Sequence, residues 1–181
     1  SCQTRSNIRK VDRLYSNFNL SSARISIYKA LSHFLILNKT PTILVDGSKI
    51  PNTSFYTLRA SLAASGRSLT LYEELYDKKE YGSVTLYSRF LDNLALVLPS
   101  DCCPVLVTDA EFRGPWFNLV YEKCWHFVGR LRAERKCRLG EDDEFYSVNS
   151  AKVIATQTPR YLGAGYINKT NSVTGNFYTY N

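Results

Sequence analysis

The stretch CPVLVTDAEFRGPWF, residues 103–117, decides how the rest of the chain is interpreted. Four apolar or β-branched residues, 105–108, are typical of a short buried strand, and they lead directly into Asp109. Pro115, a residue suited to the first turn of a helix, follows shortly afterwards. Asp109 therefore either caps the next helix or marks a strand end where α/β folds hold ligands and metals. One carboxylate does not decide between these two interpretations.

A second aspartate stands in a similar position. The residues TILVD (42–46) predict a buried strand that ends at Asp46 and is followed by a Gly-Ser turn. Apolar and polar residues then alternate over 56–62, which predicts a strand. The sequence AASGR turns the chain, and SLTLYEEL (68–75) predicts the returning strand of a hairpin. Three consecutive strands of this kind form a meander.

The second half of the chain alternates helices and strands. Its predicted elements are an amphipathic helix over Leu86–Val97, the strand 105–108, a helix from Pro115 and a strand over Trp125–Leu131. Two further strands are predicted over Tyr161–Asn168 and Phe177–Tyr180, whereas the charged residues 132–152 do not suggest any element. This order predicts an α/β protein with a mixed sheet, built as a three-strand meander and then an αβαβ unit. That is the layout of the ribonuclease H-like fold.

In such a sheet the first and fourth strands lie side by side and parallel, which would bring Asp46 and Asp109 together. Two neighbouring carboxylates are poorly tolerated in their ionised form unless a cation compensates them. Oxygen ligands favour Mg²⁺ or Mn²⁺ over zinc. Two such ions can activate a nucleophile and stabilise the leaving oxygen in phosphoryl transfer.

The charge distribution indicates a polyanionic partner. The net charge is +7, and residues 1–39 carry seven Lys and Arg against one Asp. A second basic cluster, GRLRAERKCR, occupies residues 129–138. Basic clusters with aromatic neighbours are typical of nucleic-acid binding, although solvated helix faces also carry such charges. The candidates for phosphate contacts are Arg59, Arg67, Arg113, Arg130 and Arg132.

Residues 1–39 are expected to form a short, basic helical segment. One helix is predicted over 4–16, and a second is predicted to be capped by Ser21 or Ser22. The predicted inward face of the second helix consists of Ile27, Leu31 and Phe34.

Other features of the sequence exclude some classes of protein. The five cysteines, with Cys102 and Cys103 adjacent, make a poor disulfide framework and lack the paired spacing of a zinc site. No apolar stretch approaches the length of a membrane span, and the N-terminus does not resemble a signal peptide. A cytoplasmic location without membrane contact is therefore expected.

Several stretches resemble the DDE transposases of bacterial insertion sequences, in the insertion sequence 4 family. These stretches occur in the family's order and are NIRKVDRLYSN (7–17), ILVDGSKI (43–50), LRASLAASGRSLTLYEE (58–74), FLDNLALVLPSDCCPVLVTDAEFRGPWF (90–117) and WHFVGRLR (125–132). The resemblance implies that Asp46 and Asp109 are the first two members of a catalytic, metal-binding triad that uses Mg²⁺ or Mn²⁺. It implies metal-dependent cleavage and transfer of DNA strands during cut-and-paste transposition.

The resemblance also implies a domain organisation and a partner. Residues 1–39 would be the remnant of an N-terminal DNA-binding region, and residues 40–181 a ribonuclease H-like catalytic domain that stops before its third carboxylate. The partner would be double-stranded DNA, as transposon terminal inverted repeats and target DNA, in the nucleoid of a bacterial cytoplasm.

Three departures from the family pattern bear on activity. Gly47 stands where the family commonly carries an aromatic residue, and Glu111 where it commonly carries glycine. If that glycine has a positive φ, a side chain there costs roughly 1–2 kcal/mol. The third carboxylate belongs to a Tyr–Arg–Glu–Lys motif that the sequence does not contain, and EDDE (141–144) lacks its surroundings.

The chain alone is therefore expected to be inactive. The alternatives to a transposase catalytic domain are a catalytically inactive DNA-binding remnant of a transposase and another ribonuclease H-like nuclease.

Overall fold

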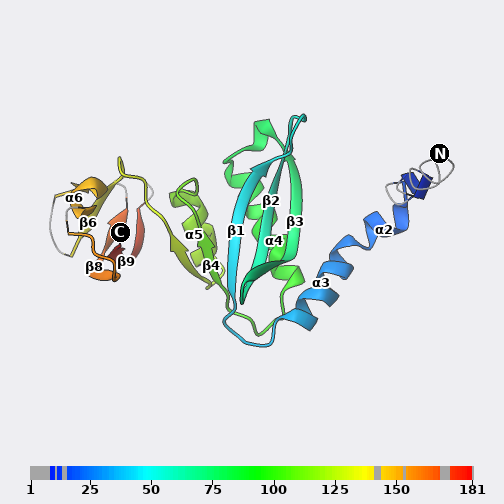
Figure 1. Ribbon diagram of the computed structural model, residues 1–181, viewed down its shortest axis with the longest axis horizontal. Coiled ribbons are helices and arrows are strands. Elements are labelled where there is room, and N and C mark those ends of the chain that lie inside the picture. The colour runs from blue at the N-terminus through cyan, green and yellow to red at the C-terminus, as the bar shows by residue number, and fades with distance from the viewer. Residues whose placement is uncertain are drawn as a thin grey trace.

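The computed structural model describes residues 9–10, 12–13, 16–140, 144–152, 154–167 and 172–180 of the 181-residue chain. Its strands form two sheets, one in the middle of the molecule and one toward the C-terminal end (Figure 1). A helical N-terminal segment projects from the side of the central sheet that lies away from the second sheet (Figure 1).

The central sheet contains five strands in the order β3-β2-β1-β4-β5. They are β1 (Thr42–Lys49), β2 (Phe55–Ala64), β3 (Arg67–Asp77), β4 (Val105–Thr108) and β5 (His126–Gly129). The first three strands pair antiparallel, whereas β4 pairs parallel with both β1 and β5. This mixed sheet, together with its helices, confirms the predicted α/β class, the meander and the parallel second half.

Two helices make the crossovers of the parallel half. Helix α4 (Val84–Val97) runs between β3 and β4, and α5 (Gly114–Glu122) runs between β4 and β5. The side chain of Ser83 caps α4 by accepting a hydrogen bond from Leu86 N at 3.2 Å. Helix α4 contacts β3 and α5, and its apolar face is fully buried in the main core. The core therefore holds the crossover helices against the sheet that carries Asp46.

The second sheet has the order β7-β6-β8-β9 and is antiparallel throughout. Its elements are β6 (Lys136–Leu139), β7 (Tyr146–Ser147), α6 (Val148–Lys152), β8 (Arg160–Ile167) and β9 (Val173–Thr179). The predicted pair of C-terminal strands is confirmed as β8 and β9. Strands β6 and β7 were not predicted, because they are very short and the first is rich in Lys and Arg. Residues 40–181 therefore contain two sheets, each with its own buried cluster.

The N-terminal segment differs from its prediction. Ser21 and Ser22 are the last residues of α2 (Phe18–Ser22), and α3 (Arg24–Leu35) begins after Ala23 without a side-chain cap. The predicted helix over 4–16 lies largely outside the described residues, although 9–10 and 12–13 are helical.

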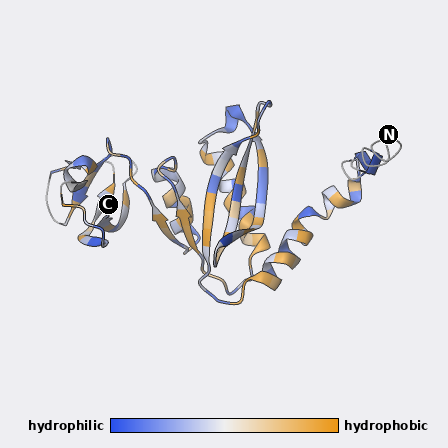
Figure 2. Cartoon of the chain, viewed as in Figure 1, coloured by the Kyte–Doolittle hydropathy of each residue, from blue (hydrophilic) through white to orange (hydrophobic). Residues whose placement is uncertain are grey.

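The prediction of which face of α3 is buried is wrong. Ile27, Leu31 and Phe34 are 48%, 41% and 79% exposed, whereas Ser32 is buried. A second stripe faces the core instead, and it consists of Ile25, Tyr28, Ser32 and Leu35. Helical spacing allows both stripes, and the contacts of α3 with α4 and β3 select the second one. Apolar residues accordingly remain on the outer surface of this helix (Figure 2).

Within the described part of the chain, no helix has both the length and the apolar character needed to cross a membrane.

Gly129 provides a test of how tightly α5 packs on the sheet. A Cβ atom at this position would lie 2.4 Å from Cζ of Phe117, whose ring packs on Phe127 at a centroid distance of 4.7 Å. We predict that Gly129→Ala lowers the free energy of unfolding by about 1–3 kcal/mol, because the ring or the strand must move. Thermal denaturation measures the change. Gly175→Ala in β9 is the matched control, since nothing lies within 4 Å of its added Cβ. Equal losses in both variants would contradict this packing.

Candidate functional site

Asp46 and Asp109 occupy neighbouring positions on two parallel strands. The register between β1 and β4 ends with the pair Val45 and Thr108, so Asp46 and Asp109 are the next residues along the two chains. Asp109 follows the end of β4, whereas β1 continues to Lys49 because Gly47 and Ser48 pair with β2. The predicted strand end at Asp46 and the predicted Gly-Ser turn are therefore wrong. Both side chains are exposed, whereas Val45 and Thr108 are buried. The prediction that the two aspartates lie on adjacent parallel strands is therefore confirmed. The carboxyl ends of parallel strands are where α/β sheets commonly place ligands.

Local hydrogen bonds orient both carboxylates. Ser48 Oγ donates to Asp46 Oδ2 at 3.4 Å, and the backbone N–H of Glu111 donates to Asp109 Oδ1 at 2.9 Å. Helix α5 has Arg113 at its N-cap position and has no side-chain cap. The interpretation of Asp109 as a helix cap is therefore wrong. Its carboxylate instead closes a turn that holds one of its oxygens in place.

The loop that follows Asp109 is fixed by contacts from distant parts of the chain. Tyr81 Oη donates to Glu111 Oε2 at 2.8 Å, and Arg132 Nε donates to the carbonyl oxygen of Ala110 at 3.0 Å. Phe112 is buried, and its ring lies 4.7 Å from that of Trp116. The loop therefore has little freedom to move. Glu111 does not adopt a positive φ, so the strain expected at this position is absent.

Tyrosine hydroxyl groups surround this loop. The hydrogen bond to Glu111, followed by burial, raises the pKa of Tyr81 to about 12. Burial raises the pKa of Tyr76 to about 12, and the charge of Glu111 contributes in the same direction. The Tyr76 hydroxyl would lie 3.5 Å from a Cβ at Gly47, so this ring occupies space beside the glycine. Both hydroxyls stay protonated at neutral pH, and that of Tyr81 donates its hydrogen bond to Glu111.

Three of the five predicted arginines gather next to Asp109. Arg113, Arg130 and Arg132 line one hollow between the start of α5 and the segment that leads to the second sheet. Arg135 lines the same hollow and was not singled out, because the sequence did not show where residues 132–152 fold. None of the four forms an ion pair with a carboxylate in the described ranges. Clustered arginines without acidic partners favour binding of a polyanion.

The other two predicted arginines have different surroundings. Arg59 lies opposite Asp46 in the β1–β2 register, but its side chain is bound to Glu73. Arg67 is at the β2–β3 turn, beyond the start of β1, and so it lies at the opposite end of the sheet from Asp46. The prediction that Arg67 surrounds the site is therefore wrong, since a long hairpin carries it away from the aspartates.

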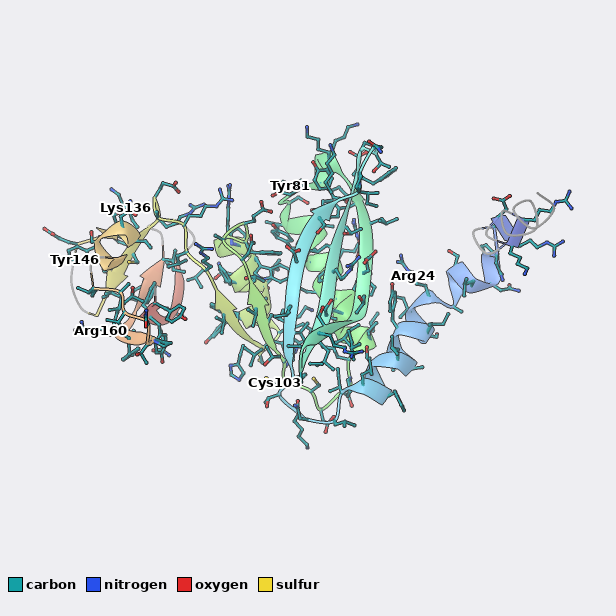
Figure 3. The ribbon with its side chains drawn as sticks, viewed as in Figure 1. Arg24, Tyr81, Cys103, Lys136, Tyr146 and Arg160 are labelled. Atoms are coloured by element: carbon teal, nitrogen blue, oxygen red, sulfur yellow. The ribbon has the colours of Figure 1, made fainter. Side chains whose placement is uncertain are left out.

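Few of the described side chains are placed to bind a metal ion at this site. Among the described residues, no group of three or more His, Cys, Asp or Glu side chains is placed to hold an ion. Glu111 is turned toward Tyr81, which is labelled at the end of the central sheet in Figure 3. Asp46 and Asp109 are therefore the two candidate ligands, and the carboxylate oxygens suit a hard divalent cation.

Comparison of the chain with protein-family models, with curated proteins and with solved structures gives no match.

Titration of Tyr81 provides a test of the contact that holds the loop. A carboxylate that accepts the hydrogen bond from a phenol stabilises its protonated form, which raises the pKa of Tyr81. We predict that Glu111→Gln lowers the pKa of Tyr81 from about 12 toward the ordinary value of 10. The pKa is measured from the absorbance of tyrosinate as the pH rises. The titration curve of each protein is corrected by subtracting that of the same protein with Tyr81→Phe, so that the difference reports on Tyr81 alone. Circular dichroism controls for unfolding at high pH, and an unchanged midpoint would contradict the contact.

Proposed function

We propose that this chain is the core of a DNA transposase catalytic domain with a ribonuclease H-like fold. The observation that carries the proposal is the pairing of β1 with β4, which places Asp46 of β1 beside Asp109, the residue that follows the carboxyl end of β4. The strand order β3-β2-β1-β4-β5, with an antiparallel meander followed by two parallel strands, supports the same fold. The resemblance of the sequence stretches around both aspartates to DDE transposases supports the reaction.

In this proposal Asp46 and Asp109 together hold one Mg²⁺ or Mn²⁺ ion. An ion held there would supply Lewis-acid chemistry for phosphoryl transfer, and the role of Asp46 and Asp109 would be to bind and orient it. The hydrogen bond from the Glu111 N–H to Asp109 Oδ1 leaves the second carboxylate oxygen of Asp109 for the ion. Arg113, Arg130 and Arg132 then neutralise phosphates of double-stranded DNA next to the ion.

Two carboxylates do not provide enough ligands for a complete two-metal centre. Mg²⁺ demands near-octahedral coordination and gives up water reluctantly, so a second ion needs a further anionic ligand. The Tyr–Arg–Glu–Lys motif that supplies it in the resembling family is not among these 181 residues. We therefore propose that the chain binds DNA and one ion but does not cut DNA by itself.

A second candidate function is a DNA-binding module without chemistry. The observation that favours it is the group of four arginines beside Asp109, which needs no metal to bind phosphate. Metal binding separates the two candidates, because a module without chemistry has no reason to keep an ion between Asp46 and Asp109.

The metal site is tested by Mn²⁺ binding, measured by electron paramagnetic resonance or calorimetry. We predict weak binding of one ion, and at least tenfold weaker binding in Asp46→Asn and in Asp109→Asn, because each change removes a charged ligand. Asp101→Asn is the control, since Asp101 is an exposed aspartate that pairs with Lys39 away from the site. Equal affinity in all four proteins would contradict the site.

The same proteins are then incubated with duplex DNA and Mn²⁺, the more permissive ion. The expected result is no strand cleavage. Cleavage by the unaltered chain that disappears in Asp46→Asn would show that the two aspartates suffice, and the role assigned to a further carboxylate would be wrong.

The arginine group is tested by the salt dependence of duplex binding. Each neutralised phosphate contributes a slope of about −0.9 to the plot of log K against log salt. We predict that Arg113→Ala and Arg130→Ala each reduce the magnitude of this slope by about one. Arg67→Ala is the matched control, because it removes the same charge at the opposite end of the sheet. A loss of the same size in Arg67→Ala would show that net charge, and not this cluster, governs binding.

A further inference from the structure

The outward face of the second sheet carries aromatic and basic side chains. Side chains alternate between the two faces of a strand, and Cys137, Ile167 and Phe177 point into the small core. The register places another set on the opposite face, which we call the tyrosine face. It consists of Lys136, Arg138, Tyr161, Tyr166, Asn176 and Tyr178.

Two tyrosines of this face are exposed side by side. Tyr161 and Tyr178 are directly paired across β8 and β9, their ring centroids lie 5.1 Å apart, and they are 53% and 64% exposed. Tyr161 Oη donates to Asn176 Oδ1 at 3.0 Å, which fixes the orientation of its ring. The rings are therefore held in place while their surfaces remain in water. Flat aromatic groups in such a position can accept another flat group by stacking.

The charge of this face is positive. The guanidinium carbon of Arg138 lies 4.8 Å from the centroid of Tyr166, and Lys136 is exposed on the same strand. Lys136 is one of the labelled side chains at this sheet in Figure 3. Strands β6, β7, β8 and β9 contain no Asp or Glu. Among the described residues, the nearest acidic positions in sequence are Glu134, before β6, and Glu144, before β7. The acidic residues 141–143 also belong to the connection between β6 and β7 but lie outside the described residues.

We infer that the tyrosine face binds single-stranded nucleic acid. Unpaired bases stack on exposed aromatic rings, and a nearby cation attracts the phosphates that link them. The bases of a duplex are already stacked on each other, so a duplex can interact with the tyrosine face through its phosphates but not through stacking. An acidic protein would match the charge but would leave the fixed tyrosine pair unexplained. A second copy of the chain would place Lys136 and Arg138 against like charges.

This inference does not depend on the proposed function, because neither Asp46 nor Asp109 belongs to the face. The test measures fluorescence anisotropy of labelled oligothymidylate of about 12 nucleotides, within the span that one small domain covers. EDTA is present so that metal-dependent binding does not contribute. The expected result is at least tenfold tighter binding of the single strand than of a duplex of equal length. We expect the double variant Tyr161→Ser/Tyr178→Ser to lose about tenfold or more in single-strand affinity and to keep its duplex affinity.

Two matched variants make the result specific. Tyr161→Phe/Tyr178→Phe retains the rings and is expected to retain binding, which distinguishes stacking from hydrogen bonding by the hydroxyls. Tyr121→Ser removes an exposed tyrosine of α5 and is expected to leave binding unchanged. Equal affinity for single strand and duplex, or an equal loss in Tyr121→Ser, would overturn the inference. The inference would also be overturned if the chain associates with itself and the double serine variant abolishes this association, because the tyrosine face would then be an interface between copies.

Discussion

The parallel pairing of β1 with β4 is the constraint on which the rest of the structure depends. Ile43, Val45 and Leu106 are buried at this pairing, so the two strands are held in one register by the main core. A shift of one residue would move every side chain to the other face, which the buried positions do not allow. Asp46 and Asp109 are exposed and directly follow the buried residues Val45 and Thr108. Their proximity is therefore a consequence of core packing.

The same constraint explains why the loop after Asp109 is rigid. Strand β4 has to end where α5 begins to cover the sheet, and Phe112 and Trp116 enter the core at that point. The exposed part of the loop is then bound by Tyr81 from before α4 and by Arg132 from after β5. Segments that follow the two edge strands, β3 and β5, thus both contact this turn. A site built on such a turn is preorganised, which favours selective binding of an ion.

The segment after β5 connects the site to the second sheet. Arg130, Arg132 and Arg135 line one hollow together with Arg113, at the start of α5, and Ile167 of β8. Val173 of β9 also joins the larger core. A phosphate held by these arginines would lie at the start of α5 and beside the segment that connects the two sheets. Binding of duplex DNA at the aspartates and of a single strand at the tyrosine face would therefore involve two surfaces linked by this short segment.

The sequence by itself determined the existence and order of the five strands of the central sheet, both crossover helices and the neighbourhood of the two aspartates, but it placed the end of β1 at Asp46 although the strand continues to Lys49. These features are local: short β-branched runs, an alternating hairpin and an amphipathic helix each have a period that identifies them. It also located the arginines beside Asp109, since Arg113 lies in the connection between the predicted strand 105–108 and the next helix, and Arg130 and Arg132 lie at the end of the strand predicted over Trp125–Leu131.

Only the tertiary structure decided which face of α3 is buried, because two stripes satisfy the helical period and contact with α4 selects one. The tertiary structure also places Arg67 away from the site and brings Glu111 into a hydrogen bond with Tyr81. Strands β6 and β7 form from a charged segment that has no periodic pattern of its own. In each case the deciding partner is distant in sequence, so its effect cannot be read from local periodicity.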